Sequence, residues 1–291
     1  MGDRKMASAP PSPVHVPRRF DVTFPDCGAT HSGDLFLILD GARINAPRFI
    51  YERDDRPEMD LLYRSTPHEP VKEVSPCIVR PSENSRLRGD VDNWRSDGIA
   101  IESRADIHAL GNHLRSLISV RLPDGALAYL RFYSPSQIEP LLSSFSAHEL
   151  TRFSGPVTRW HYFAPVDGWK TVEVPGTSES QEASNEGWFQ LSEEHLRAIE
   201  AGNEAVFRKK LVHQAGWPVT PESMSRIDQI VLRASSFGFQ TQGDIATYAE
   251  LACYYGDRLE EPNALAVLKS EDKPAGLRLE MVDSMMSYGD A

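Results

Sequence analysis

The stretch SRADIHALGNHLRSLISVRLPDGALAYLRFYSPS, residues Ser103–Ser136, organises our interpretation of the rest of the chain. Ser103 is a favourable helix N-cap, and Asp106 follows in the first turn, where negative charge stabilises a helix. Apolar residues then recur with the spacing of one helix face, at Ile107, Leu110, Leu114 and Leu117. This pattern predicts an amphipathic helix that packs against a sheet.

A β-hairpin is predicted directly after this helix. Two apolar runs, Val120–Leu122 and Ala126–Tyr133, flank the tripeptide Pro123–Gly125. Pro fixes φ, Asp can bond its own backbone and Gly accepts a left-handed conformation, so the tripeptide is typical of a tight turn. The second run is apolar on both faces except for one Arg, which favours a central strand of the sheet. A second helix should follow, beginning at Ser136 or at Pro140.

The amino-acid sequence of this segment resembles that of a known protein family. The run HLRSLISVRLPDGALAYLRFYSPS, His113–Ser136, is similar to the signature segment of the type VI secretion effector-adaptor chaperones, the Tap or effector-chaperone family. DGARINAPRFIYE (Asp40–Glu52) and TYAELACYYG (Thr247–Gly256) also resemble family segments, so the similarity spans about residues 34–270. Ser134 and Ser136 stand where the family usually has Asp and Arg.

This resemblance implies a function in protein delivery. Proteins of the family hold one toxic effector and hand it to the VgrG-type spike protein of the type VI apparatus. It implies no cofactor, no nucleotide and no metal. Two other classes stay open from the residues themselves: a hydrolase with a dispersed active site, and a structural protein associated with the secretion baseplate.

Composition limits the partners and the compartment. The chain has 291 residues and a formal net charge of −11, which argues against nucleic acid and anionic membrane as main partners. No apolar run approaches the roughly 20 residues of a membrane helix, and no secretory leader is apparent. Three widely spaced cysteines without a CxxC motif favour packed thiols in a cytoplasmic protein.

The same patterns predict an α+β protein of two lobes. The N-terminal lobe should be a mixed α/β unit built on the central hairpin with flanking helices, and the C-terminal lobe should be all helical. Strand-like runs precede Ser103 and follow Gly155. After the linker, Ser192, Thr220 and Thr241 are expected to begin helices, and Ile245 and Tyr248 should face inward on the third of them. The expected organisation is a disordered leader (1–20), an α/β adaptor lobe (21–175), a linker (176–187), a helical lobe (188–270) and a flexible tail (271–291).

No spacing typical of catalysis is present, so we do not expect an enzyme. His148-Glu149 lacks the second His of a zinc-protease helix, and there is no Gly-x-Ser-x-Gly elbow or phosphate-binding loop. No catalytic, cofactor-binding or metal-binding residue is therefore assigned.

Six residues are candidates for partner binding. Arg131 could contact a carboxylate of a partner, although stacking between Tyr129 and Tyr133 explains it as well. Trp94 and Trp160 could be interface anchors, because Trp is enriched at binding hot spots, or could lie in the core. Residues 176–291 contain 10 Lys+Arg and 19 Asp+Glu, so the helical lobe should be acidic and attract a basic partner. The candidate carboxylates there are Glu193, Glu200 and Glu204.

Overall fold

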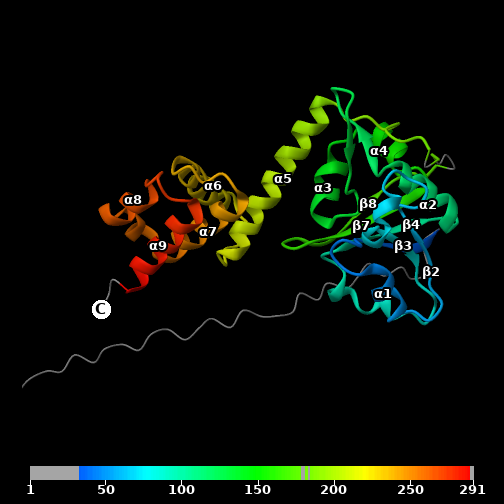
Figure 1. The fold of residues 1–291 in the computed structure, drawn as a ribbon, viewed down its shortest axis with the longest axis horizontal. Helices are drawn as coiled ribbons and strands as arrows, with labels where there is room; N and C mark the ends of the chain where they lie inside the picture. The colour runs from blue at the N-terminus through cyan, green and yellow to red at the C-terminus, as the bar shows by residue number, and fades with distance from the viewer. Residues whose placement is uncertain (1–32, 178–180, 183, 289–291) are drawn as a thin grey trace, which may run out of the picture.

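Two lobes are joined by one long helix (Figure 1). The computed structural model describes residues 33–177, 181–182 and 184–288. An α/β lobe is formed by the first part of the chain and a helical lobe by the last part, which confirms the predicted α+β class. No helix among the described residues is long and apolar enough to cross a membrane.

A six-stranded antiparallel sheet forms the centre of the α/β lobe. Its strand order is β2-β3-β1-β4-β7-β8, so β1 and β4 are central. Each of these strands corresponds to a run identified in the sequence. The strands are β1 (Asp34–Leu39), β2 (Glu58–Leu61), β3 (Cys77–Arg80), β4 (Gly98–Ser103), β7 (Val157–Ala164) and β8 (Gly168–Glu173).

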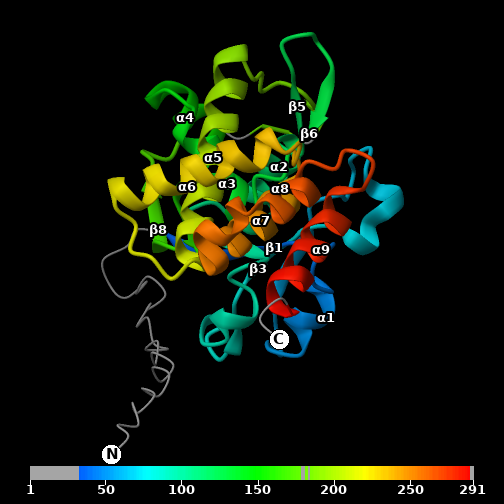
Figure 2. The ribbon, with the colours of Figure 1, turned by 90° about the vertical axis from the view of Figure 1, so that its left-hand side faces the viewer.

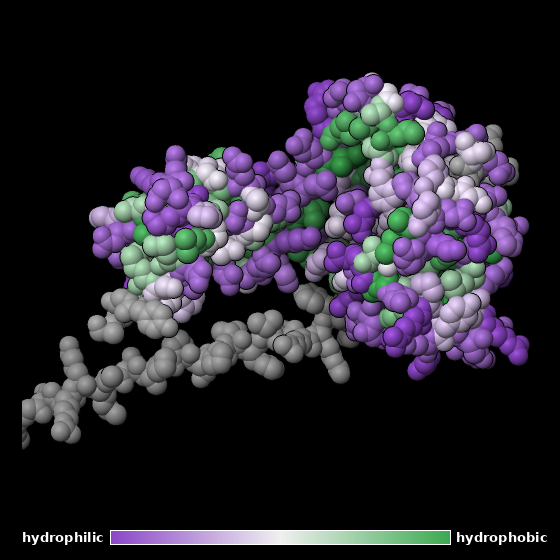
Figure 3. Space-filling view, in the orientation of Figure 1, coloured by the Kyte–Doolittle hydropathy of each residue, from purple (hydrophilic) through white to green (hydrophobic). Residues whose placement is uncertain are grey.

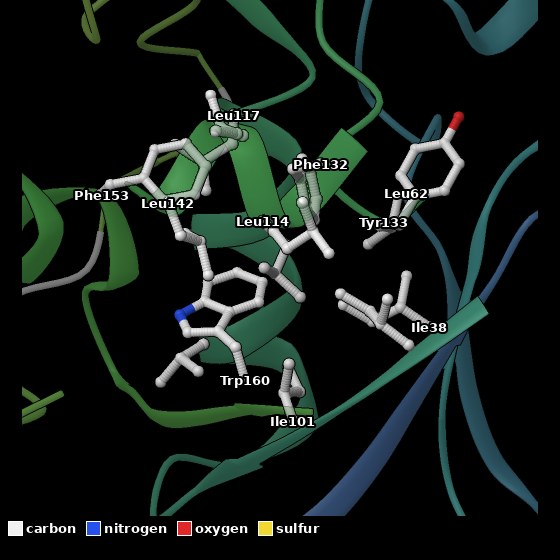
Figure 4. Close-up of a cluster of buried hydrophobic side chains, with 14 of the residues drawn as sticks. Ile38, Leu62, Ile101, Leu114, Leu117, Phe132, Tyr133, Leu142, Phe153 and Trp160 are labelled. Carbon is white, nitrogen blue, oxygen red and sulfur yellow. The ribbon is translucent and has the colours of Figure 1, made fainter. Parts of the chain in front are cut away.

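One face of the sheet carries the main core. Phe36 and Ile38 of β1, Ile101 of β4 and Trp160 of β7 point to this face because side chains alternate along a strand. Three helices pack over it, and Leu114 shares the core with these strand residues (Figure 4). The helices are α2 (Ile107–Ser116), α3 (Pro135–Ser143) and α4 (Ala147–Ser154).

The opposite face carries a smaller core. Leu37, Val79 and Ala100 pack there with Trp94 and with the short helix α1. Glu102 and His161 are also buried, and their Oε1 and Nε2 atoms lie 3.0 Å apart. The elements on this side are α1 (Ala46–Tyr51) and two short 3₁₀ helices, η2 (Arg86–Arg88) and η3 (Val91–Asn93), while a third, η1 (Glu69–Val74), lies between β2 and β3 in the chain.

The predicted hairpin exists, but the prediction that it is central was wrong. β5 (Ser119–Arg121) and β6 (Leu127–Tyr129) form a separate two-stranded sheet, and Leu127 is 49% exposed. The turn is as expected, with Gly125 at a φ of +87°. The apolar residues after Tyr129 suggested a longer, central strand. The strand instead ends at Tyr129, and the chain then turns inward, so Phe132 is buried under the main sheet.

The helical lobe consists of four helices packed around the second half of α5 (Glu193–Gln214). The caps expected from the sequence are confirmed: Ser192, Thr220 and Thr241 each accept a backbone hydrogen bond at a helix N-terminus. Figure 2 looks onto this lobe and shows α7 beside α6 and α9. The remaining elements are α6 (Pro221–Ser236), α7 (Gln242–Tyr255), η4 (Gly256–Glu260), α8 (Pro262–Leu268) and α9 (Ala275–Tyr288).

The two cores divide inside α5 and not at the linker expected over 176–187. Leu196 and Ile199 pack on the core of the α/β lobe, whereas Phe207, Leu211 and Val212 pack in the helical lobe. The described residues of the expected linker lie along the α/β lobe. The backbone N–H groups of Thr177, Gln181 and Gly187 donate to atoms of Gly155, His113 and Ser119 in that lobe, at 2.9–3.2 Å. One helix therefore belongs to both lobes.

The C-terminal end also differs from the expectation. Residues 271–291 were expected to be a flexible tail, but α9 occupies Ala275–Tyr288 and buries Leu279, Val282 and Met286. The reason is that these apolar residues recur at helical spacing and complete the core around α7. The expected leader at residues 1–20 lies outside the described residues.

Candidate protein-interaction surface

Arg131, the first candidate, is bound within its own chain. Its guanidinium forms an ion pair with Asp40, whose carboxylate is buried at the end of β1. Asp40 also accepts a hydrogen bond from the backbone N–H of Ala42 at 3.0 Å. The ion pair raises the pKa of Arg131, although burial opposes this. Arg131 thus fastens the segment after β6 to the turn after β1.

A chain of tyrosine hydroxyls lies beside this ion pair. The Tyr129 hydroxyl is 2.5 Å from that of Tyr63 and 2.5 Å from that of Tyr133. Burial, reinforced by the neighbouring phenols, raises the pKa of Tyr129, and burial also raises the pKa of Tyr133, so these two groups stay protonated at neutral pH. The Arg131 guanidinium carbon is 6.0 Å from the centre of the Tyr133 ring. The stacking expected for Arg131 is thus present on the Tyr133 side, and the Arg holds a carboxylate of its own chain.

Trp94 and Trp160 do not contribute to an exposed surface. Both side chains are fully buried. The Trp94 indole N–H donates to the backbone carbonyl of Leu87 at 2.9 Å, and that of Trp160 donates to the Ser154 hydroxyl at 2.9 Å. A residue with no exposed surface cannot anchor a partner in this conformation. The prediction that Trp94 and Trp160 are interface anchors was therefore wrong, and both lie in the core, which was the alternative.

The three candidate carboxylates lie on exposed positions of α5. Glu193 is in the first turn, beside the α/β lobe. Glu204 is paired with Arg208 at 3.0 Å, and Arg208 also contacts Asp228 of α6 at 2.8 Å. Glu200 forms no ion pair with any residue that the structure describes. The three residues therefore mark the helix between the lobes, while most of the acidic surface lies further along the chain.

Specific contacts fix the position of α5 on the α/β lobe. Gly202 meets Pro140 of α3 so closely that a Cβ on Gly202 would lie 2.8 Å from the Pro140 Cβ. Lys209 of α5 reaches Asp167 in the turn between β7 and β8 at 3.0 Å. Lys170 joins the same Asp167 at 2.9 Å. The second lobe is therefore held at a defined place beside the first.

Three hollows run from the joint between the lobes across the helical lobe. The first, the interlobe groove, has a volume of about 470 Å³ and lies between the start of α3, the middle of α5 and the start of α7. The second, the α5–α7 groove, has a volume of about 510 Å³ and shares Gln214 and Ala246 with the first. The third, the α7–α9 groove, measures about 650 Å³ and shares Thr247, Glu250 and Tyr254 with the second.

These hollows form one connected surface whose charge changes along its length. Lys210 lines the interlobe groove, whereas Asp244, Glu250, Glu280 and Asp283 line the α7–α9 groove. Apolar residues also show at the hollow between the lobes, beside α5 (Figure 3). Concave, partly apolar surfaces of this size accept protein segments or small ligands.

One cluster contains the residue types of a hydrolase but not the required geometry. The Ser119 hydroxyl donates to the Glu186 carboxylate at 2.5 Å, and it lies 3.5 Å from Nε2 of His68. In a nucleophilic triad the His stands between the Ser and the acid, so that the acid orients the base. Here Ser119 stands between the other two, and Glu186 does not orient His68.

The cysteines are unsuited to nucleophilic chemistry in the described part of the chain. Burial raises the pKa of the Cys77 thiol to about 12, and burial also raises the pKa of Cys253. A thiol with a raised pKa carries little thiolate at neutral pH. No group of three or more His, Cys, Asp or Glu side chains within the described residues is arranged to hold a metal ion.

Sequence reasoning missed the connected grooves. Helical periodicity identified Ile245 and Tyr248 as inward residues of α7, and both are buried. Tyr254, which lines two of the grooves, was not identified, although two adjacent tyrosines at the end of one helix were a visible signal. The helical spacing of the buried apolar residues in α9, a segment expected to be a tail, was a second signal that could have located the α7–α9 groove.

Comparison with known proteins agrees with this architecture. Residues 35–152, from β1 to α4, match the model of a family described as a domain of unknown function, DUF4123. The chain is also similar to the accessory protein VasW of Vibrio cholerae serotype O1, strain El Tor Inaba N16961. The two are 25% identical over 239 residues, which cover 78% of this chain and 77% of VasW. No solved structure matches the chain.

These matches relate one part of the chain to a known domain and most of the chain to one relative. The family model that residues 35–152 match is that of a type VI secretion effector-adaptor domain. The match runs from β1 to α4 and leaves β7, β8 and the helical lobe outside it. Because the match to VasW covers 78% of the chain, it is longer than the part that precedes α5 and extends into the helical lobe.

Proposed function

We propose that this protein is an adaptor that binds one toxic type VI effector and loads it onto a VgrG-type spike protein, without catalytic turnover. The observation that carries the proposal is the relation between the family match and the two lobes. The match covers residues 35–152 of the α/β lobe, from β1 to α4, while the helical lobe has its own core and an open, grooved surface. An adaptor needs two such surfaces, because it meets two partners.

The two lobes suit different tasks in this proposal. The α/β lobe carries the family domain and performs the task that family members share, which is contact with the secretion machinery. The helical lobe is acidic and grips the effector through charge and groove contacts. Electrostatic attraction of this kind accelerates association and weakens in salt.

Co-purification tests the proposal. The full chain, produced together with the effector whose gene adjoins its own, should elute as a stoichiometric complex and bind the C-terminal region of the spike protein. Reversal of Glu193 and Glu200 to Lys should slow effector association, less so at high salt, and should leave spike binding unchanged. Glu204→Lys is kept as a separate variant because Glu204 also pairs with Arg208.

Two outcomes would contradict parts of the proposal. Metal-independent or metal-dependent hydrolysis by the isolated chain, with no binding of effector or spike, would favour the rival hydrolase. If the charge reversals lower spike binding and leave effector association unchanged, the tasks of the two lobes are exchanged. A chain that binds only baseplate proteins would be the structural component instead.

A further inference from the structure

The strand β6 of the hairpin has one edge that is paired with β5. The N–H of Leu122 donates to the carbonyl of Ala126 at 2.8 Å. At the other end of the ladder, the N–H of Leu130 donates to the carbonyl of Ile118 at 2.7 Å. Pairing with β5 therefore extends from Ala126 to Leu130, one residue beyond each end of β6.

The alternation of an antiparallel ladder decides which backbone groups of β6 face outward. Ala126 and Leu130 bond β5, and Ala128 lies between them at the same phase of the strand. The N–H and C=O groups of Leu127 and Tyr129 therefore point away from β5. None of these four backbone groups forms a hydrogen bond with any residue that the structure describes.

The far side of β5 shows the same alternation with its partners in place. The N–H of Arg121 donates to the carbonyl of Phe189, and the carbonyl of Arg121 accepts from the N–H of Leu191, both at 2.9 Å. The carbonyl of Ser119 accepts from the N–H of Gly187 at 3.2 Å. Residues 187–191 thus cover one side of the two-stranded sheet, and β6 is its open edge. Figure 2 shows the tip of this hairpin projecting from the α/β lobe.

The open edge is accessible, and its side chains are held in place. The side chains of Leu127 and Tyr129 are 49% and 39% exposed, and they share one face because they are two residues apart. The Tyr129 ring packs edge-on against His68 and Tyr63, with ring centres 5.2 and 6.2 Å away. A partner would therefore meet a surface that is already formed.

The two edges of the main sheet are protected in a way that β6 is not. The edge strand β2 carries Glu58, and the edge strand β8 carries Lys170 and Glu173. Charged side chains on an edge strand discourage pairing with another chain. Residues 125–130 contain no charged residue and no Pro. Of these three edge strands, β6 is the one that is suited to accept another strand.

We propose that β6 pairs with an extended strand of the VgrG-type spike protein, through the outward N–H and C=O groups of Leu127 and Tyr129. This inference rests on the proposed function for the identity of the partner. Backbone groups at strand spacing fit an extended segment and not a helix, because the backbone groups of a helix are bonded internally. Apolar or aromatic side chains of the added strand would lie opposite Leu127 and Tyr129.

The position of this edge in the chain favours the spike over the effector. β6 lies within residues 35–152, the part of the chain that the family model matches. In the proposed function this part meets the secretion machinery, and the helical lobe meets the effector. Strand addition relies on main-chain hydrogen bonds for affinity, which suits a contact that the family shares.

Hydrogen exchange of individual amides tests the pairing directly. In the free full chain, the amides of Leu127 and Tyr129 should exchange fast and that of Ala128 slowly, because only Ala128 is at the phase that bonds β5. Addition of the C-terminal region of the spike protein should slow exchange at Leu127 and Tyr129 at least about tenfold. A complex in which both amides exchange as in the free chain would overturn the inference.

A proline variant removes one outward donor and leaves the bonds to β5 in place. Pro is tolerated at an edge position whose N–H faces solvent, so Leu127→Pro should keep the hairpin. It should weaken spike binding at least about tenfold, whereas Leu127→Ala, which keeps the N–H, should weaken it less. The control Met59→Pro removes an outward N–H of β2 and should leave spike binding unchanged.

Urea unfolding of the variants shows whether the α/β lobe stays folded. Equal weakening of spike binding by the two proline variants, with both folded, would overturn the inference. If Leu127→Pro unfolds the lobe, amide exchange in the wild-type complex decides the question.

Binding measurements with both partners distinguish this inference from the proposed function. If the spike protein binds the wild-type chain and Leu127→Pro equally, the strand inference fails and the adaptor function stands. If the effector binds the wild-type chain and the spike protein does not, the loading function fails and the strand inference fails with it. If the effector or a second copy of the chain slows exchange at Leu127 and Tyr129 and the spike protein does not, the edge has another occupant and the inference is overturned.

Discussion

The two lobes stabilise their buried charges in different ways. In the α/β lobe, most of the buried carboxylates described pair with Arg: Asp40 with Arg131, Asp60 with Arg115 and Glu102 with Arg159. Asp54 instead accepts hydrogen bonds from Ser82. Among the described residues of α6–α9, the buried charged side chain is Arg278, and it bonds carbonyl groups instead. Its Nη1 donates to Phe237 at 2.8 Å and to Leu268 at 2.6 Å, where α6 and α8 end.

This difference bears on what each lobe can do. Buried ion pairs tie segments that are far apart in sequence, so the α/β lobe has a fixed shape with its charge already neutralised inside. In the helical lobe the helix ends are fastened by one Arg, and the carboxylates stay on the outside. The buried ion pairs of the α/β lobe suit a task that does not vary. The exposed carboxylates of the helical lobe remain available to bind a partner.

The largest effect is expected from breaking the buried pair in the α/β lobe. Arg115→Met leaves the Asp60 carboxylate buried with only Arg64, an exposed side chain, at 3.0 Å. We expect the free energy of unfolding to fall by about 3 kcal/mol, the lower end for an orphaned buried charge. Urea unfolding followed by Trp fluorescence measures this.

Two controls sharpen the interpretation for Arg115. Arg80→Met removes an exposed Arg that contacts Asp34 and Glu58 and should change stability by less than about 1 kcal/mol. Arg115→Met combined with Asp60→Leu should recover most of the loss, because an apolar pair leaves no buried charge. If the double variant is as unstable as Arg115→Met, shape and not charge determines the effect.

A smaller effect is expected from the helical lobe. Arg278→Met leaves the carbonyls of Phe237 and Leu268 without their donor but creates no buried charge. The loss should be about 1–3 kcal/mol, the cost of unsatisfied buried acceptors. Hydrogen exchange should show faster opening of α6 and α8 with the strands of the main sheet unchanged. Equal acceleration in both lobes would contradict the separation of the two cores.

The smallest effect depends on pH and concerns His113 of α2. Its Nε2 donates to the Phe153 carbonyl at 2.8 Å, and its Nδ1 accepts from the Gln181 N–H at 3.2 Å, so the ring is held neutral. Burial lowers the pKa of His113 below its ordinary value of 6.5. The unfolded chain therefore binds more protons just below pH 6.5, and stability should fall as the pH drops through that range.

A matched variant on the same helix tests the His113 prediction. His113→Gln should flatten the dependence of unfolding free energy on pH between about pH 5 and 7, whereas His108→Gln, at an exposed position, should leave it unchanged. Urea titrations at several pH values provide the comparison. If stability is already independent of pH in this range for the wild-type chain, the ring is not held neutral by burial.

Local patterns predicted the elements better than their arrangement. The caps at Ser192, Thr220 and Thr241 were read from the sequence because a helix start depends on a few neighbouring residues. The place of the hairpin depends on whether the chain continues or turns inward after Tyr129, which alternation alone does not determine. Sequence likewise could not reveal that Arg131 bonds Asp40, 91 positions earlier in the chain.

The candidate site shows the same limit. Net charge identified the helical lobe as acidic, because composition needs no structure. Glu193, Glu200 and Glu204 lie on the helix between the lobes. Glu250 and Glu280, which line the α7–α9 groove, are 30 positions apart in the sequence and belong to two different helices. The identity of a groove depends on which helices become neighbours, and α9 had been expected to be a tail.

The shared helix α5 has a consequence for the order in which the protein forms during synthesis. Chains elongate at about 5–20 residues per second, so the stretch from the end of α5 through α9 takes roughly 4–15 s to be made. In that interval Leu196 and Ile199 already have their core in the α/β lobe, while Phe207, Leu211 and Val212 still lack the helices they pack against. The finished α/β lobe thus presents a half-docked helix on which α6, α7 and α9 assemble in turn, and the acidic groove is completed last.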